Sequence, residues 1–120
     1  MSSGRILILE DDARVASAYA EALRHDGHDV TVCTGFEEAR DYVKVDCPDA
    51  VLTDIRVGQY NGLQLALLFR EICPDGRVVV VTGHDDPVIR SEVAALHGEF
   101  LVKPISLSEL RTLFSESVPH

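Results

Sequence analysis

The sequence lacks the features of a membrane-bound or exported protein. None of its apolar stretches is long enough to cross a bilayer, and the first residues, MSSGR, contain no signal-peptide core. Basic residues are also scarce, because 11 Lys and Arg stand against 20 Asp and Glu, for a formal net charge of −9. This charge repels a phosphate backbone, so we expect a cytoplasmic protein that binds no membrane and no nucleic acid directly.

Cysteine and histidine form no recognisable metal-binding pattern. Cys33, Cys47 and Cys73 are odd in number and widely spaced, without a CxxC pair. They therefore predict neither a disulfide framework nor a zinc site, and we expect buried or half-buried free thiols. The five histidines are scattered along the chain, which argues against a metal role for them.

The chain also lacks low-complexity tracts and internal repeats, and its size limits it to one domain. It has 120 residues, of which 46% are hydrophobic and 26% charged, an ordinary globular composition. A chain of this length supports one hydrophobic core. We expect a single domain over residues 1–120, with its folded part at about 5–117.

Apolar segments alternate with helical segments along the whole chain. The apolar segments are mostly continuous runs of Val, Ile and Leu, which is typical of strands buried on both faces of a parallel sheet. The predicted strands are Arg5–Leu9, Asp29–Cys33, Asp49–Thr53, Arg77–Thr82 and Glu99–Val102. Five strands alternating with five helices predict a doubly wound, flavodoxin-like α/β fold.

Capping residues mark where several helices begin. Thr34 with Glu37 and Ser106 with Glu109 have capping-box spacing, in which each side chain bonds the other residue's backbone N–H. Asp12 is placed to cap the first helix, and Asp86 precedes a proline suited to a first helical turn.

Four of the predicted strands end next to a polar residue suited to phosphate and magnesium chemistry. These residues are Glu10 with Asp11, Asp54, Thr82 and Lys103. In an open parallel sheet the carboxyl ends of the strands meet at one edge, so we expect the side chains to converge there. Each alone has a simpler explanation, such as a cap, a satisfied backbone group or a solvated charge. Their joint occurrence favours one site.

The residue types suggest phosphoryl transfer. Crowded carboxylates repel one another, and Mg²⁺, or alternatively Mn²⁺, would offset that repulsion while accepting phosphate oxygens. Asp54 would lie centrally, where a carboxylate can attack phosphorus to form an acyl phosphate. Lys103 and Thr82 offer an ammonium and a hydroxyl to the transferred group.

Five motifs in order resemble the receiver (REC) domain of the two-component response-regulator family, a chemotaxis-type single-domain fold. The motifs are ILILEDD, PDAVLTDIR, NGLQL, VVVVTG and FLVKPISLSEL. The resemblance implies a phosphoprotein of a phosphorelay in signal transduction, rather than an enzyme with a separate substrate. Its donor would be a phosphohistidine on a sensor histidine kinase or His phosphotransfer protein, and its partner an output domain or a second copy.

The resemblance also implies a role for each site residue. Asp54 would be the phosphoacceptor, and Asp11, Asp54 and the backbone carbonyl of Arg56 would bind Mg²⁺, with Glu10 acting through water. Lys103 would pair with the acceptor carboxylate and then with the phosphoryl group. The switch residues would be Thr82 and the aromatic Phe100, and the Lys103-Pro104 peptide bond is expected to be cis.

Several residues depart from the family pattern near this site. Phe100 stands where Tyr is common and has no hydroxyl to donate. Gly58 replaces a common proline, which leaves more backbone freedom beside the metal site. The Arg56 side chain either stays solvated or reaches Glu10 or Asp11. Gly83 leaves space for a donor, whereas His84 either alters water access or is an ordinary loop residue.

The third helical segment is more apolar than one core stripe requires. The stripe consists of Leu65, Leu68, Phe69 and Ile72, and the surplus of Leu63, Ala66 and Leu67. The surplus is either a contact patch for a dimer mate or attached domain, or ordinary scattered exposure.

Three functional classes remain open at this stage. The first is the phosphorylated signalling module. The second is a metal-dependent phosphohydrolase with an Asp nucleophile, although the spaced acid pair of that class is absent. The third is a pseudo-receiver that binds partners without phosphorylation. The kinase, the stimulus, the output and the oligomeric state are open, as is whether the domain acts alone or within a larger regulator.

Overall fold

A computed structural model describes residues 4–57 and 60–115. Its centre is a five-stranded sheet in the order β2-β1-β3-β6-β7, with every neighbouring pair parallel. The strands are β1 (Arg5–Leu9), β2 (Asp29–Cys33), β3 (Ala50–Asp54), β6 (Arg77–Thr82) and β7 (Glu99–Val102). The predicted parallel α/β fold is confirmed, and only β3 is shifted, by one residue, so that Asp54 itself ends the strand.

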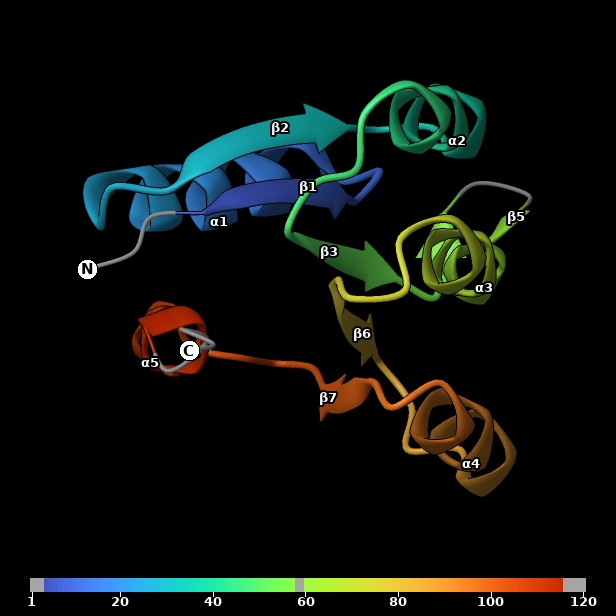
Figure 1. Cartoon of the computed structure of the whole chain (residues 1–120). Coiled ribbons are helices and arrows are strands. Elements are labelled where there is room, and N and C mark those ends of the chain that lie inside the picture. The colour runs from blue at the N-terminus through green and yellow to red at the C-terminus, as the bar shows by residue number, and fades with distance from the viewer. Residues whose placement is uncertain (1–3, 58–59, 116–120) are drawn as a thin grey trace.

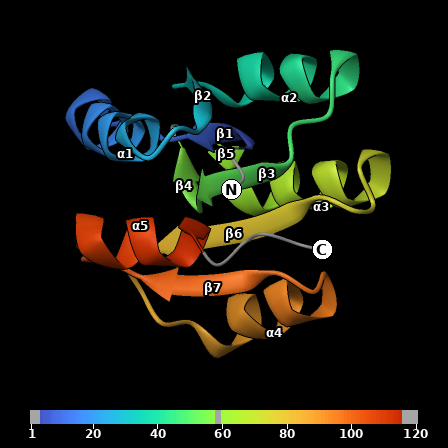
Figure 2. The same cartoon turned by 60° about the vertical axis from the view of Figure 1, so that its left-hand side comes forward.

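Helices cover both faces of this sheet (Figure 1). One face carries α1 (Ala13–His25) and α5 (Leu107–Ser115), and the other carries α2 (Phe36–Val45), α3 (Gly62–Ile72) and α4 (Pro87–Ala95). Figure 2 shows the same arrangement turned about the vertical axis, so that α1 and α5 come forward. Among the described residues, no helix combines the length and the apolar character that crossing a membrane requires.

Alternating strand residues build a hydrophobic core on each face. In β1, Leu7 and Leu9 point to the cluster under α2, α3 and α4, while Ile6 and Ile8 point to the cluster under α1 and α5. β6 divides its valines between the same two clusters. Because both faces are covered, the strands are apolar at almost every position, which is the pattern that the sequence showed.

Three of the four predicted helix caps are confirmed. Asp12 Oδ1 accepts from the backbone N–H of Arg14 at 3.0 Å, and Asp86 Oδ1 accepts from that of Val88 at 2.8 Å. Ser106 and Glu109 form the complete capping box, with reciprocal hydrogen bonds of 2.9 and 3.0 Å. Such caps stabilise a helix by about 1 kcal/mol each.

The capping box predicted at Thr34 is wrong. Helix α2 begins at Phe36 with Gly35 as its N-cap, and no side chain caps it. This start lies one residue later than the box requires. Two acidic residues in the first turn, Glu37 and Glu38, complement the positive end of the helix dipole instead.

A short antiparallel hairpin between β3 and α3 was not predicted. It pairs β4 (Arg56–Val57) with β5 (Tyr60–Asn61). Strands of two residues are too short to show an alternating pattern, which explains why the sequence did not reveal them. Gly58, for which we predicted backbone freedom, lies outside the described residues.

Most of the surplus apolar surface of α3 is core, which leaves little of it for a contact patch, one of the two alternatives that the sequence left open. Leu63 and Ala66 are buried with Leu65 and Phe69, because α3 packs against both the sheet and α2. Leu67 is 50% exposed, and Ile72, predicted to be core, is 37% exposed. A single half-exposed leucine is ordinary on a protein surface.

The cysteine prediction is wrong for two of the three residues. Cys47 and Cys73 form a disulfide with a Cα separation of 5.9 Å, whereas Cys33 is a buried free thiol as expected. The two partners are 26 residues apart in the chain, but each lies shortly before one of two neighbouring strands, β3 and β6. The strand pairing therefore brings them together, and spacing along the sequence could not show this.

Candidate phosphoacceptor site

Three acidic side chains meet at the carboxyl edge of the sheet. Glu10 and Asp11 follow β1, and Asp54 ends the neighbouring strand β3. Each offers a carboxylate oxygen, and these oxygens all lie within 4.8 Å of one another. Glu10 and Asp54 are buried at 2% and 8% exposure, whereas Asp11 is exposed. The predicted convergence of the acids is confirmed.

Lys103 supplies the positive charge at this edge. It follows β7, and its Nζ lies 2.8 Å from Asp54 Oδ2 and 3.1 Å from Glu10 Oε1. Burial alone would lower the pKa of this ammonium, but the hydrogen bonds to Asp54 and Glu10 outweigh burial and raise it above its ordinary value. Lys103 therefore stays charged across the physiological pH range. The Lys103-Pro104 bond is cis, as predicted.

Glu10 has an unusual electrostatic environment. Its burial raises the pKa of the carboxyl group, and hydrogen bonds from the Asp12 N–H at 3.2 Å and from Lys103 offset this only in part. Neighbouring Asp54 raises the pKa further. The protein alone thus disfavours the charged form of Glu10, and an added cation would change that balance.

Asp54 is oriented by the chain on either side of it. Its Oδ1 accepts from the backbone N–H of Arg56 at 3.1 Å, while Oδ2 accepts from Lys103. The Gly62 N–H donates to the carbonyl of Ile55 at 2.7 Å, and the Thr53 hydroxyl donates to the carbonyl of Gly62 at 3.1 Å. These bonds join the start of α3 to the end of β3, so the carboxylate has a fixed position.

Gly62 makes that close approach sterically possible. A Cβ atom on this residue would lie 1.8 Å from the backbone oxygen of Asp54 and 2.6 Å from Thr53 Oγ1. Only glycine fits here without moving the backbone. The glycine of the NGLQL motif therefore allows α3 to pack closely against Asp54, the predicted acceptor.

Thr82 lies on the strand between Asp54 and Lys103. It ends β6, is 6% exposed, and its Oγ1 accepts from the backbone N–H of His84 at 3.2 Å. Its own hydroxyl proton does not take part in that bond. Gly83 and His84 are exposed, and a Cβ on Gly83 would meet nothing within 4 Å. The loop thus leaves open space beside Thr82, in agreement with the space predicted at Gly83.

Phe100 has a partner that the sequence did not reveal. The guanidinium carbon of Arg90 lies 4.5 Å from the centre of the Phe100 ring, and Arg90 also pairs with Asp85 at 2.9 Å. Such a cation–π contact stabilises by about 0.5–1 kcal/mol at an exposed site. It depends on where the end of the Arg90 side chain lies relative to β7, which the apolar spacing of α4 does not report.

The Arg56 side chain is exposed. The backbone N–H of this residue donates to Asp54 Oδ1. This favours the solvated side chain over the alternative of partial charge neutralisation. The role of the Arg56 carbonyl stays a prediction.

The donor set fits a hard divalent cation. Glu10, Asp11 and Asp54 carry three carboxylates against the single ammonium of Lys103. Carboxylate oxygens are the ligands that Mg²⁺ and Mn²⁺ prefer, and an excess of negative charge at short range favours their binding.

Comparison with known proteins identifies the family. The family model described as response regulator receiver domain matches residues 6–115. The chain is 30% identical over 122 residues to response regulator MprA of Mycolicibacterium vanbaalenii, covering 96% of this chain and 52% of MprA. It is 28% identical over 126 residues to the DNA-binding transcriptional regulator NtrC of Proteus hauseri, covering 100% of this chain and 26% of NtrC. The chain thus spans between about a quarter and about half of these relatives.

The fold has close structural neighbours as well. A response regulator receiver domain protein (CheY-like) from Methanospirillum hungatei JF-1 aligns with a TM-score of 0.88 at 21% identity, covering 96% of this chain and 93% of that one. At this identity the likeness supports the fold alone, whereas the family match extends over most of the sequence. This chain belongs to the response regulator receiver domain family.

Proposed function

We propose that the domain accepts a phosphoryl group on Asp54 from a phosphohistidine of a sensor histidine kinase or His phosphotransfer protein. The observation that carries this proposal is the environment of Asp54, a nearly buried carboxylate with one oxygen on a backbone N–H and the other 2.8 Å from an ammonium. A carboxylate in such a position is a nucleophile whose developing and transferred charges can be stabilised locally.

The transfer needs few parts beyond positioning and charge. A carboxylate oxygen of Asp54 attacks phosphorus as the phosphorus–nitrogen bond of the phosphohistidine breaks, and the imidazole keeps the electron pair and takes up a proton. Lys103 moves its hydrogen bond from the carboxylate to a phosphoryl oxygen. The Thr82 hydroxyl donates to another, because its proton is not used in the bond from His84.

A magnesium ion, or a manganese ion, completes the proposed site. Asp11 and Asp54 would hold it together with the Arg56 carbonyl, and Glu10 would act through water. When bound, the ion neutralises charge on the phosphoryl oxygens. The separation of at most 4.8 Å among the three acids supports this ligand set.

Phosphorylation is proposed to switch a protein-interaction surface through Thr82 and Phe100. The added charge draws Thr82 toward the phosphoryl group and biases the packing near β7. The partner is an output domain or a second copy of the domain, since the curated relatives are longer than this chain. Residues 1–120 act as one cytoplasmic receiver domain, which catalyses only its own phosphorylation and dephosphorylation.

One experiment separates this proposal from its alternatives. The protein is incubated with acetyl phosphate or phosphoramidate and Mg²⁺, and its intact mass is followed over time. The proposal expects a single labile phosphoryl adduct that is lost in Asp54→Asn and retained in the control Asp75→Asn, which changes an exposed acid outside the site. Sustained release of phosphate over many turnovers would indicate a phosphohydrolase, and the absence of an adduct would indicate a pseudo-receiver.

A further inference from the structure

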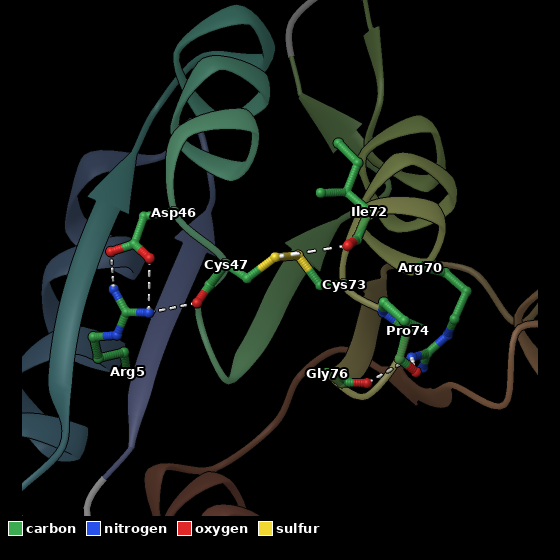
Figure 3. Close-up of a disulfide and its surroundings, with 8 residues drawn as sticks. All are labelled: Arg5, Asp46, Cys47, Arg70, Ile72, Cys73, Pro74 and Gly76. Carbon is green, nitrogen blue, oxygen red and sulfur yellow. Dashed lines mark hydrogen bonds and ion pairs between the residues drawn. A yellow bond between two sulfur atoms is a disulfide. The ribbon is translucent and has the colours of Figure 1, made fainter.

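The disulfide lies at the edge of the sheet opposite the phosphoacceptor site. Cys47 precedes β3 and Cys73 precedes β6, so both lie near the amino ends of those strands (Figure 3). Asp54, Thr82 and Lys103 follow or end strands at the carboxyl edge. The bridge therefore joins the segment after α2 to the end of α3 without contacting the acidic cluster.

The two sulfur-bearing residues differ in access. Cys47 is exposed, whereas Cys73 is 5% exposed. An external thiol can therefore reach the bridge from the side of Cys47. The Ile72 carbonyl oxygen lies 3.8 Å from Cys47 Sγ. A reduced Cys47 thiol would thus find an acceptor for its proton where it already lies.

Other interactions hold both cysteine backbones in position. The Arg5 guanidinium pairs with the Asp46 carboxylate and donates to the Cys47 carbonyl. On the other side, Arg70 donates to the carbonyls of Pro74 at 2.8 Å and Gly76 at 2.7 Å, directly after Cys73. Figure 3 shows both arginines flanking the bridge. Since these contacts do not depend on the sulfur–sulfur bond, the two thiols stay close after reduction.

We propose that Cys47 and Cys73 form a reversible thiol–disulfide exchange site that is entered through Cys47. Its oxidation state sets the stability of the domain and leaves the chemistry of Asp54 unchanged. The reaction partner is a small-molecule thiol and its disulfide, such as reduced and oxidised glutathione.

The exchange proceeds in two balanced steps. A thiolate attacks Cys47 Sγ, the bond to Cys73 breaks, and Cys73 leaves as a thiolate that takes up a proton. A second thiolate then attacks the external sulfur of the mixed disulfide and releases Cys47. In total the protein disulfide is reduced to two thiols while two external thiols are oxidised to one disulfide. Reoxidation reverses these steps.

The size of the closed loop predicts the effect on stability. The cysteines are 26 residues apart, and the loop between them contains β3, the hairpin and α3. Closing a loop of this length restricts the unfolded chain, and for a domain of this size the expected rise in melting temperature is about 10 °C.

Thiol counting tests whether the pair exists. The protein is equilibrated with oxidised or reduced glutathione, unfolded in denaturant with an alkylating reagent, and weighed. The oxidised protein should carry one alkyl group, on Cys33, and the reduced protein three. Three alkyl groups under both conditions would overturn the proposal.

Single variants test the direction of entry. In Cys73→Ser the remaining exposed Cys47 should form one mixed disulfide with oxidised glutathione in the native protein. In Cys47→Ser the buried Cys73 should react at least tenfold more slowly. Equal rates would contradict entry through Cys47. Both variants should melt about 10 °C below the oxidised parent and show no further change when reductant is added.

A phosphorylation assay tests whether the oxidation state affects the chemistry of Asp54. The rate of adduct formation with acetyl phosphate should be equal, within twofold, in the oxidised protein, the reduced protein and Cys47→Ser. A phosphorylation rate that changes with the oxidation state of the disulfide would refute the claim that the disulfide leaves the chemistry of Asp54 unchanged. If no form is phosphorylated, the proposed function fails, whereas the thiol counts and melting temperatures still test the exchange site.

Discussion

Replacing Gly62 with alanine should lower the stability of the domain and displace Asp54, its proposed phosphoacceptor. The added methyl group would lie 1.8 Å from the backbone oxygen of Asp54, whereas an ordinary contact begins at 3.4 Å. The start of α3 or the end of β3 must therefore move by about 1.6 Å. Both are backbone, so no flexible side chain can absorb the displacement.

The expected cost follows from that displacement. Overpacking a well-ordered interior costs about 1–3 kcal/mol, and we expect the upper end because the hydrogen bond from Gly62 to Ile55 is strained at the same time. Unfolding entropies of about 2 cal/mol/K per residue convert 3 kcal/mol into a fall of about 12 °C in melting temperature. A misplacement of about 1 Å at a reacting group can lower a rate by about 100-fold.

Calorimetry and intact-mass kinetics check the two effects separately. The matched control is Gly35→Ala, since a Cβ on Gly35 meets nothing within 4 Å and the residue caps α2 outside the site. This control should lower the melting temperature by no more than about 4 °C and leave the phosphorylation rate unchanged. If Gly62→Ala behaves like the control, the close approach of α3 to Asp54 does not constrain the site.

Three further predictions concern single side chains. Lys103→Met should slow phosphorylation by about 100-fold and, in metal-free buffer at neutral pH, destabilise the domain by about 1–2 kcal/mol because the buried Glu10 carboxylate loses its counter-charge; denaturant unfolding should show this loss shrinking as acid protonates Glu10. Burial raises the pKa of Cys33 from 9.0 to about 11, so the stability associated with its protonated thiol is present below pH 9.0 and lost as the pH rises through about 11. Cys33→Ala should remove that part of the alkaline decline in unfolding free energy, and an unchanged slope would contradict it. His97 has a positive φ of 59°, so His97→Gly should raise the melting temperature by about 4 °C, and a fall would argue against strain at this residue.

The site could be predicted from the sequence because two simple regularities combine. Apolar runs mark strands, and parallel strands bring their carboxyl ends to one edge, so Glu10, Asp54 and Lys103 had to meet. In the structure, Lys103 Nζ lies 2.8 Å from Asp54 Oδ2 and 3.1 Å from Glu10 Oε1. Both regularities depend only on where each strand ends, and the order of residues in the sequence shows this. An apolar stripe records which side of a helix faces the core, but not which neighbouring ring an exposed side chain such as Arg90 meets, and the contact between Arg90 and Phe100 was therefore missed.

The sequence signal for a helix cap failed where a neighbouring residue took the N-cap position instead. Asp12 and Asp86 act as caps because each is followed directly by a helix, whereas Thr34 is followed by Gly35, which takes the N-cap position itself. The cysteine prediction failed for a different reason. Spacing along the chain says little about two residues that strand pairing brings within 5.9 Å.

The two edges of the sheet differ in how their charges are balanced. At the amino edge, opposite charges are paired and the chain is cross-linked, with Arg5 bound to Asp46 and a disulfide beside it. At the carboxyl edge, the carboxylates of Glu10, Asp11 and Asp54 lie close together, and Lys103 pairs with two of them. Burial raises the pKa of Glu10 because its charge is poorly solvated there. A site with the proposed function, which would bind a cation and a phosphoryl group, has to hold unbalanced charge, and such charge opposes folding. Stabilising contacts placed at the opposite edge offset that cost without altering the acids. Changes in cross-linking at one edge and in charge at the other should therefore have additive effects on unfolding free energy.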